Sequence, residues 1–153
     1  MGSVIEHHYP PAVLSARWPA QFGGVPGALR AAVERSGSAV IVSADGEVDV
    51  SNQDEWEYVL SKAAATTPAP GPFVVDVRGL NFMGSGAYAA LARETDRCRR
   101  RKISVRLVSQ QPIVARTVAA CGLRPVLAIY PSLAAAFSWN SSPSLAAKDR
   151  GSR

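Results

Sequence analysis

One serine in the sequence stands where it could take part in chemistry. Ser85 lies in the stretch Leu80–Tyr88, which reads LNFMGSGAY, with a glycine on each side of the serine. The stretch follows an apolar run typical of a buried strand and precedes a run whose apolar residues have helical spacing. A serine at such a junction can be a nucleophile, part of a phosphate-binding loop, a phosphorylation site or a helix cap.

The catalytic alternatives for Ser85 lack the residues that they need. Acyl transfer requires a general base, usually a histidine, and the only two, His7 and His8, lie in the N-terminal part of the sequence. A nucleophile elbow would have glycine at positions 83 and 87, which are Met83 and Ala87 here. The turn also lacks the lysine and the glycine spacing of nucleotide-binding loops. We therefore expect no enzyme activity, no catalytic residue and no cofactor.

Ser85 is well placed to cap the helix that follows it. A serine at the N-cap accepts a backbone hydrogen bond and stabilises a helix by about 1 kcal/mol. The hydroxyl would then lie at the surface, close to the positive end of the helix dipole. A phosphoryl group there adds a charge of about −2 and can change a docking surface without unfolding the domain.

The two cysteines, Cys98 and Cys121, are a candidate redox pair. Basic neighbours in the sequence can lower the pKa of the Cys98 thiol, which a redox role would require. Two unrelated thiols, in the core or at the surface, are the alternative. No further metal ligands stand beside His7 and His8, so we expect no metal site.

A basic cluster, Arg97 with residues 99–102, falls at the C-terminal end of the helix predicted after Ser85. Cations at that end complement the helix dipole, so a solvated helix end explains them. An acidic partner or a nucleic acid is the alternative. No aromatic residues are interleaved with the cluster and no helix-turn-helix pattern lies nearby, so we expect no direct binding to nucleic acid.

The elements that position these residues follow from the spacing of apolar side chains. Alternation predicts a strand from Leu29 to residue 34, and Ser36-Gly37 predicts a turn into a strand at 39–44. Ser51 is expected to cap a helix that runs to about residue 65 and places Trp56 in the core. The remaining predictions are strands at 73–77, 103–108 and 126–129, and helices at 86–101, 112–122 and 131–137. This alternation predicts an α/β domain with one mixed β-sheet flanked by about four helices.

Length and composition are typical of a soluble protein with a single domain. The 153 residues are 47% hydrophobic and 19% charged, with a formal net charge of +5. We expect residues 1–27 to form an irregular arm, residues 28–140 the folded domain and residues 141–153 a disordered tail. Two free thiols, no signal-peptide pattern and no apolar run of roughly 20 residues together predict a cytoplasmic protein that does not enter a membrane.

Several segments, in order along the chain, resemble the STAS domain of bacterial anti-sigma factor antagonists. Residues 44–52, ADGEVDVSN, resemble the family's Gly-Glu-Leu/Ile-Asp segment, which lies just ahead of its first helix. Residues 73–91, FVVDVRGLNFMGSGAYAAL, resemble the stretch in which a strand leads into Asp-Ser-Ser-Gly. CGLRPVLAIY and IYPSLAAAF, at 121–130 and 129–137, resemble the end of the domain. The resemblance covers about residues 29–138 and implies a single STAS-like domain.

The resemblance also implies a function. In that family an unphosphorylated antagonist binds an anti-sigma factor, often a serine kinase of the histidine-kinase-like ATPase type, and the sigma factor is released. Phosphorylation of the first serine of the motif breaks the complex. Ser85 matches that serine, so the resemblance implies phosphorylation at Ser85. The partner-binding surface that it implies consists of Asp49, Ser51, Asn52, Gly84, Gly86 and Tyr88.

The turn departs from the family motif at three positions. Gly84 replaces the aspartate, Gly86 the second serine and Ala87 the glycine. The missing carboxylate bears on recognition by the kinase, so partner binding without a phosphorylation switch stays open. A second class of function also stays open, a sensory or scaffolding module that binds a regulator or a small ligand. We expect a monomer or a weak dimer.

Overall fold

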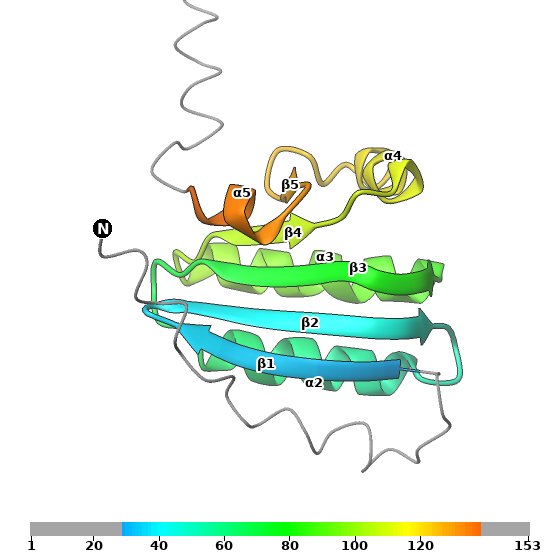
Figure 1. The fold of residues 1–153 in the computed structure, drawn as a ribbon, viewed down its shortest axis with the longest axis horizontal. Coiled ribbons are helices and arrows are strands. Elements are labelled where there is room, and N and C mark those ends of the chain that lie inside the picture. The colour runs from blue at the N-terminus through cyan, green and yellow to red at the C-terminus, as the bar shows by residue number, and fades with distance from the viewer. Residues whose placement is uncertain (1–28, 139–153) are drawn as a thin grey trace, which may run out of the picture.

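A computed structural model describes residues 29–138, which form a five-stranded sheet with four helices (Figure 1). The strands are β1 (Leu29–Ser36), β2 (Ala39–Val48), β3 (Phe73–Met83), β4 (Val105–Val108) and β5 (Ala128–Tyr130). The helices are α2 (Gln53–Ala65), α3 (Ser85–Arg100), α4 (Pro112–Ala120) and α5 (Leu133–Phe137). The predicted α/β class and the order of the elements are confirmed. The predicted arm at 1–27 and tail at 141–153 lie outside the described residues.

The strands lie in the sheet in their sequence order, β1-β2-β3-β4-β5. β1 and β2 form an antiparallel hairpin that turns at Gly37, whose φ of 63° suits glycine. The pairs β2–β3, β3–β4 and β4–β5 are parallel, so the sheet is mixed, as predicted. Because β2 and β3 are parallel, their C-terminal ends lie at one edge of the sheet (Figure 1).

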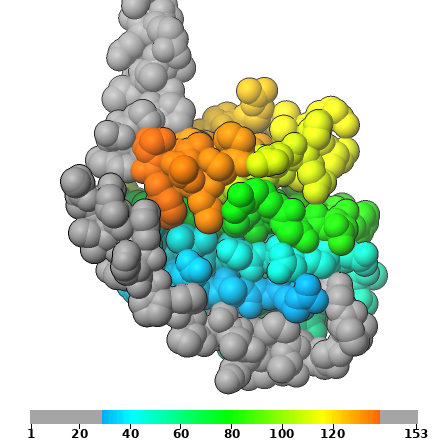
Figure 2. Space-filling view, in the orientation of Figure 1, coloured from blue at the N-terminus to red at the C-terminus, as the bar shows by residue number. Residues whose placement is uncertain are grey.

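The two faces of the sheet are covered differently. α2 and α3 lie side by side behind one face (Figure 1), and the main core fills the space between them and the strands. α4 contributes Val114 and Val118 to this core. On the other face α5 covers a smaller cluster built on Ile41, Val74 and Val108. Beside α5, residues of β1, β2 and β3 reach the surface (Figure 2).

β2 and β3 extend beyond the apolar runs that predict them, by four residues to Val48 and by six to Met83. The two strands continue to pair up to the register Val48↔Met83, with irregularities between Ser43 and Asp45 and after Gly46. Backbone pairing holds these segments in the sheet although several of their side chains are exposed. As a result both strands end together, and the turns that follow them start from neighbouring positions.

Two predicted helix caps are wrong by one residue. The N-cap of α2 is Asn52 rather than Ser51, and the N-cap of α3 is Gly84 rather than Ser85. Ser85 is instead the first helical residue of α3, and Gly84, in extended conformation, has no side chain to donate or accept a capping bond. At the end of α4 the prediction is confirmed, because Gly122 follows the helix with a φ of 74°.

Candidate functional site

The turn before α2 and the turn before α3 lie side by side at the edge of the sheet. The backbone N–H of Gly84 donates a hydrogen bond of 2.9 Å to the carbonyl oxygen of Val48. On the helix side, a Cβ added to Gly86 would overlap the side-chain amide of Gln53, so α2 and α3 begin in close contact. The two segments that the sequence assigns to one surface are therefore adjacent. Their binding role stays a prediction.

Asp49 and Asn52 hold the first turn together. The Asn52 side chain accepts a hydrogen bond from the Asp49 N–H and donates one to the Glu47 carbonyl oxygen, each of 2.9 Å. The Ser51 hydroxyl donates to the Asp49 carboxylate over 2.6 Å, and the Ser51 N–H donates to the same oxygen. These bonds, the hydroxyl of Ser51 foremost, lower the pKa of the Asp49 carboxyl. Asn52 is buried, so its side chain is structural, while Ser51 is exposed.

Replacing Ser51 with alanine is expected to raise the pKa of Asp49 towards its ordinary value of 3.8. The folded-state pKa of Asp49 is depressed, so the hydrogen bonds stabilise the fold above the unfolded-state pKa. This contribution is lost as the pH falls through the folded-state pKa. An NMR titration of the carboxyl carbon measures the shift. Ser61→Ala, at an exposed position within α2, is the control that should leave Asp49 unchanged. An unchanged pKa in Ser51→Ala would contradict this role of Ser51.

Ser85 stands exposed at the start of α3. Within residues 29–138 its hydroxyl and its backbone N–H take part in no hydrogen bond, and the N–H of Gly86 is free as well. α3 has no acidic side chain in its first turn. The first backbone N–H groups of a helix attract an anion, so a phosphoryl group on Ser85 would meet a favourable field. The hydroxyl is therefore exposed to solvent, beside backbone N–H groups that favour an anion.

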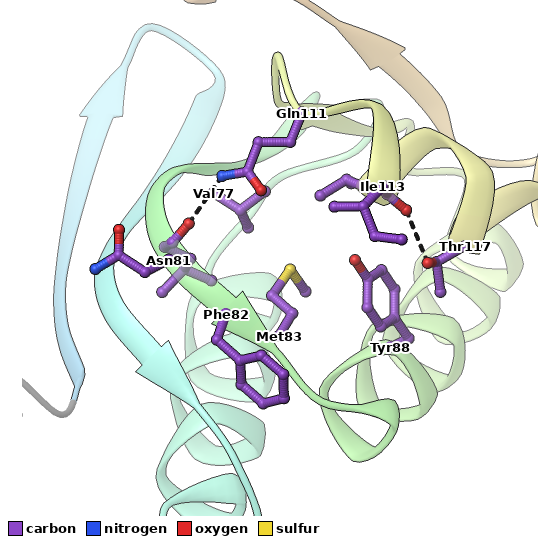
Figure 3. Close-up of a pocket in the computed structure, with 10 residues that line it drawn as sticks. Val77, Asn81, Phe82, Met83, Tyr88, Gln111, Ile113 and Thr117 are labelled. Atoms are coloured by element: carbon purple, nitrogen blue, oxygen red, sulfur yellow. Dashed lines mark hydrogen bonds between the residues drawn. The ribbon is translucent and has the colours of Figure 1, made fainter.

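Tyr88, predicted to take part in partner binding, is buried, and its binding role stays a prediction. Its side chain is only 5% exposed and points from α3 into a cavity between β3 and α4 (Figure 3). Burial raises the pKa of the Tyr88 hydroxyl, and a hydrogen bond with Thr117 partly offsets the increase. Tyr88 therefore does not form part of the exposed surface at Ser85. Its spacing on the apolar side of α3, one residue after Ala87 and three before Leu91, is the signal that indicates burial.

The position of Cys98 agrees with the alternative of two unrelated thiols rather than with a redox pair. Cys98 is fully buried in the main core, and burial, together with the nearby Glu94 carboxylate, raises the pKa of its thiol to about 11. Arg101 and Arg97 do lower the pKa of the thiol, but their effects are smaller than those of burial and of Glu94. Cys121 is exposed, and both thiols are free. The redox role proposed for the pair would therefore depend on a thiol that solvent does not reach.

Alkylation of the folded protein with iodoacetamide at neutral pH is expected to label Cys121 and to spare Cys98. The thiolate is the reactive form, and Cys98 is both buried and protonated at that pH. Peptide mass spectrometry locates the label, and the same reaction in urea should label both cysteines. Rapid labelling of Cys98 in the folded state would contradict its burial and would restore the case for a redox pair.

The basic cluster is largely engaged within the domain. Arg97 pairs with Glu94 at 2.7 Å, and Arg99 and Arg100 both pair with Asp96. The Arg101 guanidinium donates to the carbonyl oxygens of Ala64, in the last turn of α2, and of Thr67, just after it. These contacts favour the interpretation of the cluster as a helix end that ties α3 to α2.

Residues 29–138 contain no group of three or more histidine, cysteine or acidic side chains that could hold a metal ion. His7 and His8 lie outside this range. Across the same residues, every helix is too short or too polar to cross a membrane.

The domain has a mixed sheet with α2 and α3 on one face, and the exposed Ser85 begins α3. This arrangement agrees with the class of domain that the sequence motifs resemble. The chain belongs to the STAS domain family, whose model matches residues 30–136.

Two similar proteins come from Mycobacterium tuberculosis. Rv2638 of strain H37Rv, named as a candidate anti-anti-sigma factor, is 50% identical over 123 residues, which cover 80% of this chain and 83% of Rv2638. The anti-sigma-F factor antagonist RsfA of strain CDC 1551 is 48% identical over 114 residues, which cover 74% of this chain and 89% of RsfA.

Two solved structures share the fold. An anti-sigma factor antagonist from Mycobacterium paratuberculosis matches with a TM-score of 0.66 and 24% identity, over 75% of this chain and 96% of that one. The anti-sigma factor antagonist SpoIIAA in its unphosphorylated form matches with a TM-score of 0.54 and 16% identity, over 79% of this chain and 96% of that one. At these identities the likeness shows the fold alone.

Proposed function

We propose that this chain is an anti-sigma factor antagonist that acts in the cytoplasm by binding and not by catalysis. Its partner would be an anti-sigma factor of the histidine-kinase-like ATPase type, whose capture frees a sigma factor. The unphosphorylated chain binds, and phosphorylation of Ser85 dissociates the complex. The near 50% identity to proteins named as antagonists of this kind supports the proposal.

The observation that carries the proposal is the position of Ser85. An exposed and unbonded hydroxyl begins α3, directly beside the Asp49–Asn52 turn. A partner that covers the two turns covers this hydroxyl as well. A phosphoryl group would bring about −2 of charge into such an interface, next to Asp49. Binding and phosphorylation would then exclude each other without any change of fold.

Capture from the host's lysate tests the proposed function. Wild-type protein and the variants Ser85→Ala and Ser85→Glu are immobilised, and the retained proteins are identified by mass spectrometry. The proposal predicts one anti-sigma factor of the histidine-kinase-like type on wild type and on Ser85→Ala, and its loss on Ser85→Glu. Retention of that factor by all three proteins would contradict regulation through Ser85, although the chain would still bind as an antagonist. Retention of no anti-sigma factor would contradict the function itself.

The altered turn favours a second candidate, a STAS-type sensory or scaffolding module without a phosphorylation switch. Gly84 and Gly86 stand where the family motif has an aspartate and a serine. The surroundings differ at the two positions. A Cβ at Gly84 would lie 3.5 Å from its nearest neighbours, in Phe82 and Val48, whereas one at Gly86 would displace Gln53. An aspartate therefore fits at position 84 without rearrangement, which makes its role directly testable.

The variant Gly84→Asp is expected to stabilise the domain by about 0.5 kcal/mol and to be phosphorylated faster than wild type. A carboxylate at the N-cap can accept hydrogen bonds from free N–H groups at the start of α3 and lies at the positive end of its dipole. Urea unfolding measures the stability. Gly84→Asn is the control, because asparagine can also cap the helix but carries no charge. A destabilised Gly84→Asp variant would contradict the geometry. Equal phosphorylation rates would show that the kinase does not need this carboxylate.

A further inference from the structure

A cavity of about 130 Å³ lies next to the Ser85 turn, between the end of β3, the first turn of α3 and α4 (Figure 3). Its deeper wall is apolar and includes Val77, Leu80 and Val114, which are buried. Tyr88 closes one side and places its hydroxyl inside. The Gln111 side chain donates a 3.0 Å hydrogen bond to the Leu80 carbonyl oxygen and fixes α4 to β3 above the cavity. The walls therefore belong to three elements that are fixed to one another.

The mouth of the cavity has two large apolar side chains that are unusually exposed. Phe82, at the end of β3, is 53% exposed, and Ile113, at the start of α4, is 51% exposed. Val50, in the turn before α2, is 89% exposed. Large apolar side chains that remain exposed around a concave site are typical of surfaces that bind a protein partner.

The size of the cavity limits what can enter it. An apolar cavity of about 150 Å³ holds a benzene-sized group, so this one accommodates a single branched aliphatic or aromatic side chain. Anchors of this kind, seated in a pocket at the centre of an interface, contribute most of the binding energy of many complexes. Six of the lining side chains are apolar, whereas Asn81, Tyr88, Gln111 and Thr117 are polar, so a mainly apolar group fits best.

The surface beside the mouth is acidic. Glu47 on β2 is in register with Phe82 on β3, so a carboxylate lies directly beside the lip of the cavity. Asp45 lies on the same strand, Asp49 in the turn that follows it, and Asp54 and Glu55 in the first turn of α2. We define the acidic rim as these four residues with Glu47. Among residues 29–138, none of the five forms an ion pair and neither does Glu34 on β1, whereas the carboxylates of Glu57, Asp76, Glu94 and Asp96 all do. An unpaired acidic rim complements a basic partner.

We propose that the cavity receives one aliphatic or aromatic side chain of the anti-sigma factor, carried by a basic segment that lies against the acidic rim. This inference rests on the proposed function and specifies how that partner is recognised. The buried side chain supplies affinity, and the rim supplies orientation and speed of association. Ser85 lies between Met83 and Tyr88, two residues of the cavity wall, so a hydrated phosphate there would keep the partner's apolar side chain from entering the cavity.

Filling the cavity tests the inference. The probe is the anti-sigma factor recovered on wild-type protein, purified and titrated by calorimetry. Thr117 is half-buried at the cavity wall, where its hydroxyl donates to the Ile113 carbonyl oxygen of its own helix and contacts the Tyr88 hydroxyl. Thr117→Leu is expected to keep the thermal midpoint, because its added apolar contacts offset the lost contact with Tyr88, while raising the Kd about tenfold or more. Phe82→Ala should raise the Kd similarly. Tyr58→Ala, which removes an aromatic of comparable exposure from α2, should not.

The rim is tested by charge reversal. Glu47→Lys is expected to raise the Kd and to make it less sensitive to salt than the wild-type Kd, because one attractive contact becomes repulsive. Wild-type affinity in both Thr117→Leu and Phe82→Ala would overturn the inference while leaving the proposed function intact. A small molecule that co-purifies with wild type and is absent from Thr117→Leu would also overturn it, because the cavity would then be a ligand site. Failure of wild type to bind any anti-sigma factor would overturn both.

Discussion

Ser85→Glu is expected to weaken binding to the anti-sigma factor by at least about thirtyfold, because the carboxylate would lose its hydration in the interface and would add to the negative charge of Asp49. The substituted residue is the first of α3, where a carboxylate interacts favourably with the helix dipole. The thermal midpoint should therefore stay the same or rise. Calorimetric titration gives the affinity, and circular dichroism gives the midpoint.

Ser85→Ala is the matched control for this prediction. It removes the hydroxyl without adding charge, and within residues 29–138 that hydroxyl forms no hydrogen bond that could be lost. We expect its Kd to stay within about fivefold of wild type, as for most truncations at an interface. If alanine and glutamate weakened binding equally, the effect would come from lost contacts and not from charge, and the phosphorylation switch would lose its support.

Trp56→Ala is expected to have the largest effect on stability, with a loss of about 3–5 kcal/mol. Trp56 is fully buried on α2, and its indole N–H donates a 3.1 Å hydrogen bond to the Ala87 carbonyl oxygen in the first turn of α3. The Trp56 side chain therefore joins α2 to α3, the two helices that follow the Asp49–Asn52 turn and the Ser85 turn. A domain of this size has a total stability of about 5–15 kcal/mol, so the variant would be partly unfolded at physiological temperature.

Urea unfolding followed by circular dichroism measures this loss, since other tryptophans complicate fluorescence. Trp56→Phe separates the two contributions, because it keeps most of the apolar volume and removes the hydrogen bond, and it should cost about 1–2 kcal/mol. Tyr58→Ala, on the exposed side of the same helix, is the control and should cost about 0.5 kcal/mol or less. A loss below about 1 kcal/mol for Trp56→Ala would contradict its place in the core.

The order of the elements could be predicted because each one carries a local signal. Alternation marks β1, Gly37 turns the hairpin, and Gly122 ends α4. The ends of β2 and β3 could not be predicted in this way, because backbone pairing between the strands holds polar and exposed residues in the sheet as far as Val48 and Met83. Helix starts have a similar limit. Glycine and serine are both acceptable N-cap residues, so the sequence alone does not show whether α3 is capped by Gly84 or by Ser85.

The candidate site was predicted in part. The motif around Ser85 and the segment from Asp49 could be assigned to one edge from resemblance, and the parallel pairing of β2 and β3 brings them together. Helical spacing puts both Tyr88 and Cys98 on the buried side of α3, which the motif around Ser85 and the basic neighbours of Cys98 do not indicate. The cavity could not be found from sequence, since its walls come from β3, α3 and α4 and depend on how these pack.

The most direct test of the account starts from the purified complex of wild-type protein and its anti-sigma factor. ATP and magnesium are added, and samples are followed by size-exclusion chromatography and by peptide mass spectrometry. The account predicts that phosphate appears on Ser85 as the complex dissociates, and that a complex with Ser85→Ala persists under the same conditions. A wild-type complex that persists with Ser85 phosphorylated, or one that dissociates with ATP while Ser85 stays unmodified, would contradict it.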